Sequence, residues 1–362
     1  MGKLKEMVRS MASHVIVRGG ISALGRALFP KSGALILYGH RVTGDHEGYL
    51  AGLKPEWLEE QLAYLARHYE ILSLAELVRC YEERRAVPAR SVVVTFDDGF
   101  RDNLVNGLPA LRKHGIPATI FATTGCITGG ELPWSQRLGF IFQNTTVRSV
   151  TLGGAEFSLG TEAERRRACL TVKQEISSLP RLQRDARIAG LAHALAVEPP
   201  RDRMLSWAEL EEMRGQRIDV GAHTYSHPLL ARIPRAEARW EMERSREDLK
   251  ERLGIERPFF CFPGGSYNAE LKALVPALGF RSVFRPDGRL RINRLDTTDA
   301  FSLRRVGFPE APALFLEAEL DGPLHFIRTG FRKRRQESRA VGHSPSTDRA
   351  ETVVNKSSKT RS

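Results

Sequence analysis

Two adjacent carboxylates, Asp97 and Asp98, end the apolar run VVVTFDDGF at residues 92–100. Carboxylates this close repel each other, so one of them must keep its proton unless a cation lies nearby. A helix rather than a second strand is predicted to follow, and in strand–helix barrels the C-terminal strand ends carry the catalytic groups. The pair therefore indicates either an acidic site that meets a cation or a solvated turn.

Two histidines four residues apart form a second group of this kind. His223 and His227 lie in VGAHTYSHPLL (residues 220–230), where the pattern predicts a strand end leading into a turn. Alone, such imidazoles often only satisfy local hydrogen bonds. Two imidazoles and one carboxylate make a three-ligand site with an open fourth position, as in catalytic zinc centres. Asp98 is the expected third ligand, which leaves Asp97 free as a base.

The elements that must position these groups alternate between strand and helix. Apolar runs typical of strands include GALILY (33–38), SVVVTF (91–96), PATIFAT (117–123), IDVGAH (218–223) and PFFCFP (258–263). Helical spacing follows most of them, as in KPEWLEEQLAYLARHY. This order predicts parallel strands joined by helical crossovers, and therefore an α/β barrel or sheet.

The alternation breaks between about residues 134 and 205. Within this segment VRSVTLGGAEFSLG predicts a hairpin that turns at Gly153-Gly154, and two charged helices are expected after it. We interpret the segment as an insertion on the barrel, either a lid or a surface for a partner.

The formal charge of +12 lies mostly at the two ends of the chain, with net +4 over residues 1–28 and net +6 over residues 331–362. We predict a basic helical segment at 1–30, a barrel domain at 31–330 and a disordered basic tail at 331–362. Basic ends suit anionic membrane surfaces or polyanions, although solvated tails that bind nothing specific are the commoner explanation. Specific nucleic-acid binding is not expected, because no recognition motif accompanies the charge.

The sequence also bears on location. No run reaches the roughly eighteen apolar residues of a membrane span, and Arg18 and Arg26 interrupt any apolar core of a signal peptide. The four cysteines are widely separated, which favours neither a zinc knuckle nor a disulfide framework. A cytoplasmic or peripherally membrane-associated protein is expected, with residues 4–28 as the candidate attachment.

The motifs TFDDGF, GAHTYSHP and FCFPGGSYN, in this order, resemble the polysaccharide deacetylase (NodB-homology) family of carbohydrate esterases. The resemblance covers about residues 33–310. It implies a distorted (β/α) barrel that hydrolyses N- or O-acetyl groups on sugars with one divalent ion, for which zinc is expected. It implies Asp97 as the catalytic base and, as the metal ligands, Asp98, His223 and His227. Such oxygen and nitrogen ligands do not by themselves decide between zinc, cobalt, nickel and manganese.

These residue types suit amide hydrolysis, which needs an activated water, a cation at the developing oxyanion and a proton for the leaving amine. Metal binding lowers the pKa of water from about 15.7 towards about 7, and Asp97 is placed to take the water proton. Backbone N–H groups near Gly264 and Gly265 are candidate donors to the oxyanion, because glycine permits close approach. A plain turn explains the same FPGGS stretch.

Two features of many family members are missing. The third motif lacks the arginine that orients the base, and Arg304 or Arg305, in LRRVGF, is the candidate replacement. No Leu-x-x-His motif, whose histidine is the general acid, follows residue 285. His40, after the apolar run LILY, is the candidate acid or substrate contact, with a structural loop histidine as the alternative. Trp134 matches a family position near the barrel mouth, where a ring stacks on a sugar, although a core tryptophan is the commoner case.

The leading hypothesis is a metal-dependent hydrolase that removes acetyl groups from a sugar in a polysaccharide or glycolipid. One alternative is a metal-dependent hydrolase of another amide or ester, because fold and ion do not fix the acyl group. Another is a catalytically silent glycan-binding protein. The two missing features favour the catalytically silent protein, whereas the intact Asp97 favours a catalyst.

Overall fold

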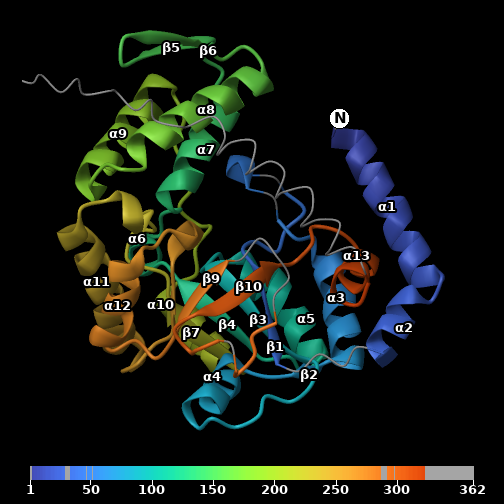
Figure 1. Cartoon of the computed structure of the whole chain (residues 1–362). Coiled ribbons are helices and arrows are strands. Elements are labelled where there is room, and N and C mark those ends of the chain that lie inside the picture. The colour runs from blue at the N-terminus through green and yellow to red at the C-terminus, as the bar shows by residue number, and fades with distance from the viewer. Residues whose placement is uncertain are drawn as a thin grey trace, which may run out of the picture.

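The computed structural model describes residues 2–28, 33–45, 47–50, 52–286, 292–296 and 298–322. The tail predicted at 331–362 lies outside the described residues. Figure 1 shows a barrel surrounded by helices, a helical insertion beyond one end of it, and two N-terminal helices along its side.

Parallel strands form the barrel. They pair in the order β1-β10-β9-β8-β7-β4-β3, and β3 pairs again with β1, so the ring closes. A short strand β2 pairs with the start of β3. The strands are β1 (Ala34–Gly39), β2 (Glu70–Ile71), β3 (Ser91–Asp98), β4 (Ala118–Ala122), β7 (Ile218–Ala222), β8 (Phe260–Cys261), β9 (Val283–Pro286) and β10 (Leu303–Gly307). The predicted parallel α/β barrel is confirmed.

The register of the strands brings the sequence motifs to one end of the barrel. Every residue of β3 is buried, as expected of a parallel strand covered on both faces. Asp98, at its end, pairs with Ala122 of β4, which pairs in turn with Ala222 of β7. Because His223 follows Ala222 directly, the acidic pair and the first histidine leave the barrel side by side.

Helices cover the outside of the barrel and include the predicted crossovers. Amphipathic spacing buries one side of each, as in α3, where Leu58, Leu62 and Leu65 face the core. Serine capping boxes begin α4 and α10. The helices of this layer are α3 (Pro55–His68), α4 (Leu74–Glu82), α5 (Leu108–Lys113), α6 (Thr124–Gly129), α10 (Trp207–Arg214), α11 (Arg235–Leu253), α12 (Ala269–Ala277) and α13 (Ala313–Leu320), with α1 (Gly2–Arg18) and α2 (Ile21–Leu28) preceding them.

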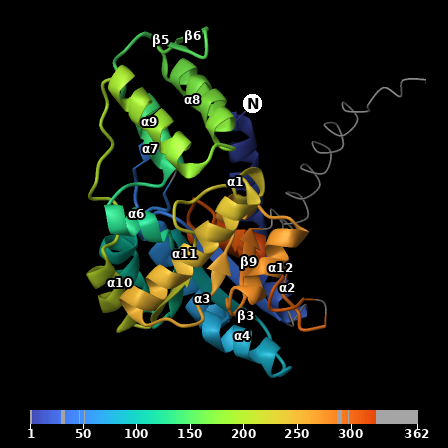
Figure 2. The same cartoon turned by 90° about the vertical axis from the view of Figure 1, so that its left-hand side faces the viewer.

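The insertion has a small core of its own. It contains α7 (Trp134–Asn144), β5 (Ser149–Leu152), β6 (Ala155–Ser158), α8 (Glu162–Ile176) and α9 (Arg181–Ala194). Leu138, Phe142, Val172 and Leu191 are among the residues of its separate apolar cluster. The predicted hairpin is confirmed, because Leu152 pairs with Ala155 across Gly153-Gly154. Figures 1 and 2 both place these elements beyond the barrel end.

Within the described residues, no helix combines the length and the apolar character that crossing a membrane requires.

Candidate active site

The acidic pair lies where β3 leaves its extended conformation. Asp98 has a φ of 74° and Gly99 a φ of 87°, both in the left-handed region. Side chains on a regular strand alternate between faces, so this change of conformation at Asp98 allows both adjacent carboxylates to approach His223. Both are buried, with only 3% of Asp97 and 2% of Asp98 exposed.

Asp98, His223 and His227 form a candidate metal site. The Oδ1 atom of Asp98 lies 3.1 Å from Nε2 of His227 and 3.5 Å from Nε2 of His223. Their possible ligand atoms lie within 4.8 Å of one another. This buried Oδ1 accepts no hydrogen bond from any described residue. An unpartnered buried carboxylate oxygen facing two imidazole nitrogens fits a divalent ion such as zinc.

The orientation of His223 suits it as a ligand. Its Nδ1 lies 2.8 Å from the carbonyl oxygen of Cys261, so this nitrogen carries the proton and donates it to the carbonyl. The lone pair of the ring is then on Nε2, the atom that faces Asp98. A backbone carbonyl thus selects the tautomer that metal binding needs.

Burial and neighbouring charges give Asp98 and His223 the protonation states in which they can bind a metal. Burial favours the neutral form of Asp98, but His227 and His40 outweigh it and hold the pKa of the carboxyl well below its usual range. Burial lowers the pKa of His223 to about 4. At neutral pH the site therefore presents a carboxylate and a neutral imidazole, and neither needs to lose a proton when a metal binds.

Arg305 is the cation that meets Asp97. Its Nη1 donates to Oδ1 and its Nη2 to Oδ2, each at 2.7 Å, and the guanidinium is buried between the rings of Tyr38 and Phe121. Burial alone would raise the pKa of Asp97, but Arg305, together with His223 and His40, outweighs burial and lowers it. Arg304 is half-buried and uses its backbone groups to bond Asn293. Of the two candidate arginines, Arg305 is therefore the one that contacts the acidic pair.

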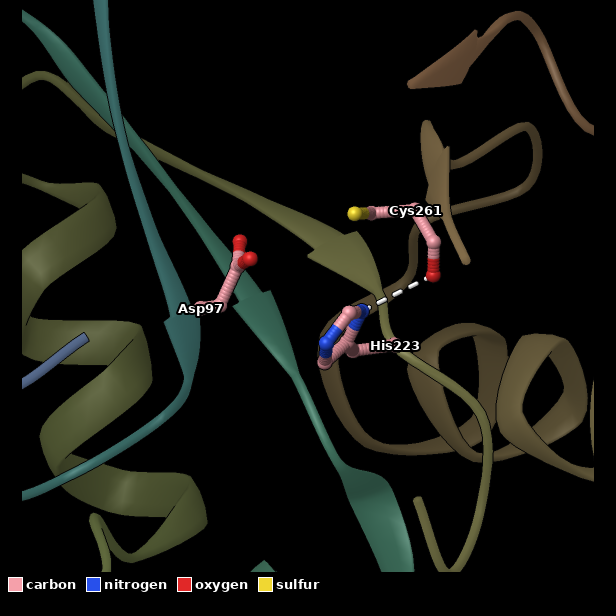
Figure 3. A group of neighbouring side chains, drawn as sticks. All are labelled: Asp97, His223 and Cys261. Carbon is pink, nitrogen blue, oxygen red and sulfur yellow. Dashed lines mark hydrogen bonds between the residues drawn. The ribbon is translucent and has the colours of Figure 1, made fainter. Parts of the chain in front are cut away.

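Cys261, at the end of β8, was not singled out from the sequence. Figure 3 shows its thiol near Asp97 and His223, and these three also form a group with metal-ligating atoms close together. Burial raises the pKa of the thiol well above its usual value, so it remains neutral and accepts a hydrogen bond from Arg305 at 2.8 Å. Arg305 also donates hydrogen bonds to both carboxylate oxygens of Asp97. The group with Cys261 therefore suits a metal less well than the one around Asp98.

A family model described as polysaccharide deacetylase matches residues 84–283, more than half of the chain. The chain belongs to the polysaccharide deacetylase family. Members are hydrolases that act on amide or ester bonds of acetylated sugars. The family supports the use of a divalent metal, and the cluster around Asp98 supplies ligands for one.

One polysaccharide deacetylase of known activity is similar to this chain over part of its length. A poly-beta-1,6-N-acetyl-D-glucosamine N-deacetylase from Staphylococcus epidermidis is 33% identical over 113 residues, which is 27% of this chain and 39% of the relative. The chain therefore spans well under half the length of that relative.

Two solved structures share the fold. The Streptococcus pyogenes deacetylase PplD, in complex with acetate, has a TM-score of 0.53 at 18% identity and matches 81% of this chain and 99% of its own. IcaB from Ammonifex degensii has a TM-score of 0.52 at 21% identity and matches 80% of this chain and 98% of its own. These likenesses support the deacetylase type of barrel.

His40 lies at the same end of this deacetylase barrel, directly after β1. It is half-buried, and its charged form would lower the pKa of both Asp97 and Asp98. Its ring meets that of Tyr38 edge-on, with centroids 5.7 Å apart. The side chain thus lies near enough to the acidic pair to influence its charge, and its role as the acid stays a prediction.

One of the two backbone donors predicted in FPGGS is corrected by the structure. The N–H of Gly265 donates to the carbonyl of Phe262 at 3.0 Å within a tight turn, so it is not available to an oxyanion. Gly264 has a φ of 56°, and a side chain there would meet Leu229, so both the backbone and the space require glycine. FPGGS therefore forms a turn, and the N–H of Gly264 as a donor to the oxyanion stays a prediction.

Trp134 is buried in the insertion rather than presented at a surface. Only 2% of it is exposed, and its ring packs on the guanidinium of Arg184. No face is free to stack on a sugar, which corrects the expected role. Its Nε1 instead donates to the carbonyl of His227 at 2.8 Å. The local pattern LPWSQRL gave no signal for this contact, because the partner lies 93 residues away.

Proposed function

We propose that this member of the family is a metal-dependent hydrolase that removes N-acetyl groups from a sugar in a polysaccharide and releases acetate. The observation that carries the proposal is the pairing of two units: the ligand cluster of Asp98, His223 and His227, and beside it an ionised Asp97 held by Arg305. One unit suits a cation and the other a base, and amide hydrolysis requires both.

Asp98, His223 and His227 would hold the ion, with zinc as the expected metal. A divalent ion there supplies Lewis acidity for the acetyl carbonyl and for the attacking water. Asp97 takes a proton from that water as it attacks. Arg305 occupies one lone pair on each carboxylate oxygen, which fixes the orientation of Asp97 and leaves further lone pairs for the proton. The C–N bond breaks to give acetate and an amine, and His40 is the proposed donor of the proton to the amine nitrogen.

The contact between Arg305 and Asp97 also bears on the alternative of a silent glycan-binding protein. That alternative drew support from the lack of an arginine in the third motif. An arginine from β10 fills the corresponding role towards the base, so catalysis is the better supported function. A hydrolase of another amide or ester remains the second candidate, because the cluster does not distinguish acyl groups.

For the substrate we propose N-acetylglucosamine polymers, by analogy with the named activity of the Staphylococcus epidermidis relative. The test measures acetate released by the zinc-loaded protein from β-1,6-linked and β-1,4-linked N-acetylglucosamine oligomers and from simple acetyl esters. Release from the oligomers supports the proposal. Release from the esters alone would favour the second candidate, and binding of oligomers without any release would favour the silent protein.

We further propose that α1 and α2 contact an anionic membrane surface. Both helices expose large apolar side chains, Met11 and Val15 on α1 and Ile21 and Leu24 on α2, each at least 44% exposed. The net charge of +4 over residues 1–28 complements anionic lipid headgroups. Such contact would make the protein peripherally membrane-associated.

Vesicle sedimentation tests this contact. The full chain should sediment with phosphatidylglycerol vesicles more than with phosphatidylcholine vesicles, and Val15→Glu with Leu24→Glu should abolish the difference. Leu170→Glu, which changes an equally exposed leucine on α8, is the matched control and should sediment like the wild type. Sedimentation unaffected by the double change would refute the contact.

A further inference from the structure

The turn that carries His227 is strained. Thr224 and His227 have φ angles of 67° and 61°, in the left-handed region that side chains other than glycine rarely adopt. Such a conformation persists only where surrounding contacts hold it. The contacts of this turn therefore show which parts of the chain hold His227 towards Asp98.

The barrel holds the first half of the turn. The N–H of Thr124 donates to the carbonyl of Thr224 at 3.2 Å, and the N–H of Gly125 donates to that of Tyr225 at 2.8 Å. Within the turn, the N–H of His227 donates to the hydroxyl of Thr224 at 3.1 Å. These bonds fix the chain before Ser226 but leave the carbonyl of His227 itself to another partner.

Helix α11 holds the middle of the turn through Glu241. Its fully buried carboxylate accepts a hydrogen bond from the N–H of Ser226 at 2.7 Å and another from the hydroxyl of the same residue. A buried carboxylate is stable only with such donors or with a nearby cation.

The insertion supplies that cation. Arg184, on α9, is fully buried, and its Nη2 donates to the hydroxyl oxygen of Ser226 at 2.9 Å. The hydroxyl of Ser226 therefore links the guanidinium to Glu241. The guanidinium carbon lies 5.3 Å from the ring centre of Trp134, whose Nε1 donates to the carbonyl of His227. Two stacked side chains of the insertion thus hold two successive residues of the turn.

We propose that Arg184 and Trp134 are positioning residues through which the insertion holds His227 in place for metal binding. The insertion then acts as a clamp on the turn. This inference rests on the proposed function, because it assumes that Asp98, His223 and His227 bind the ion.

Titration of the metal-free full chain with Co²⁺, followed by its visible absorption, tests the clamp without any substrate. Arg184→Met removes the guanidinium and keeps a long apolar side chain. Trp134→Phe keeps a ring over Arg184 and removes only the donor to His227. Changes at groups that orient metal ligands typically weaken metal affinity by about 10- to 100-fold. We expect a loss in this range for both variants, together with an altered cobalt spectrum.

Arg187→Met is the matched control, because Arg187 lies on the same helix but is partly exposed and pairs only loosely with Glu175, at 3.6 Å. It should bind Co²⁺ like the wild type. Ser226→Ala, a small change that removes the link between Arg184 and Glu241, gives a further variant if Arg184→Met does not fold, and it should also weaken binding.

The outcomes separate the two proposals. If the wild type binds Co²⁺ and the Trp134→Phe and Ser226→Ala variants bind it with the same affinity and spectrum, the clamp is refuted and the metal site stands. A lower melting temperature of the metal-free variants with unchanged Co²⁺ binding would likewise reduce the network to a structural role. If the wild type binds no Co²⁺, the metal site itself is refuted, and the clamp with it.

Discussion

The guanidinium of Arg305, on β10, donates two hydrogen bonds of 2.7 Å to the carboxylate of Asp97, at the end of β3. The two residues are 208 positions apart in the chain. Bidentate ion pairs of this kind fix the geometry of the two side chains as well as their charges. Burial strengthens their hydrogen bonds, because the protein interior has a low dielectric constant. The contact keeps Asp97 ionised and fixes its orientation beside the ligand cluster.

Arg305→Lys should therefore impair the base without emptying the metal site. An ammonium cannot reproduce the two parallel hydrogen bonds, so the pKa of Asp97 should rise and its orientation should loosen. We expect kcat/KM to fall by about 10²-fold, the lower end of general-base contributions, and the acidic limb of the pH–activity profile to move to higher pH. Arg304→Lys, one position along the same strand, is the control and should change neither. An unshifted acidic limb in Arg305→Lys would contradict the proposed effect on Asp97.

Substitution of a ligand histidine should instead remove the metal. His227→Gln leaves Asp98 and His223 with an incomplete set, so metal content after dialysis should fall to a small fraction of the wild-type value, and acetate release should fall with it. Chelation of the wild type should have the same effect, and added Zn²⁺ should restore activity only to the wild type. Full metal content in His227→Gln would remove this residue from the site.

Metal-free protein should lose stability on mild acidification because of His223. Its pKa is about 4 in the folded state, against an ordinary value of 6.5, so between these values the unfolded chain binds a proton that the folded chain does not. The free energy of unfolding should then fall as the pH drops from 6.5 to 4. The lowered pKa of Asp98 acts in the same direction, but only below its ordinary value of 3.8.

Urea unfolding at about pH 7 and about pH 5 measures this dependence. The His223→Asn variant should show a smaller difference between the two than the wild type. Equal differences would mean that His223 does not hold a lowered pKa in the folded protein.

His40→Gln tests the proposed proton donor. Loss of a general acid typically costs about 10²- to 10⁴-fold, but a leaving group that is already a weak base needs no proton. We expect a loss in this range with N-acetyl sugar oligomers and a much smaller one with 4-nitrophenyl acetate. His193→Gln, at an exposed position on α9, is the control. Equal losses on both substrates would assign His40 a structural or binding role.

The parts of the site that could be predicted from the sequence are those formed by residues close together in the chain. Asp97 with Asp98 and His223 with His227 lie at strand ends whose apolar runs indicate both the element and its end. The parallel barrel follows from the same alternation of strand and helix. These features depend on local pattern, so no long-range contact had to be known.

The choice between Arg304 and Arg305 depended on which of the two side chains on β10 faces the inside of the barrel. Neighbouring side chains on β10 point to opposite faces, but Leu303 and Val306 are both buried, so the apolar pattern does not show which arginine faces inward. The roles of Trp134 and Arg184 depended on how the insertion packs against the turn at His227. Contacts between segments so far apart in the chain arise from tertiary packing, and they produce no recognisable pattern of residue spacing in the sequence.

The central claim is that Asp98, His223 and His227 bind one divalent ion while Asp97 stays uncoordinated and acts as the base. The most direct test compares wild type and Asp97→Asn, both loaded with Zn²⁺ and desalted, for metal content and for acetate released from N-acetylglucosamine oligomers. The account predicts about one ion per chain in both proteins, and acetate release from the wild type alone. An Asp97→Asn protein that has lost its ion, or one that releases acetate at the wild-type rate, would contradict it.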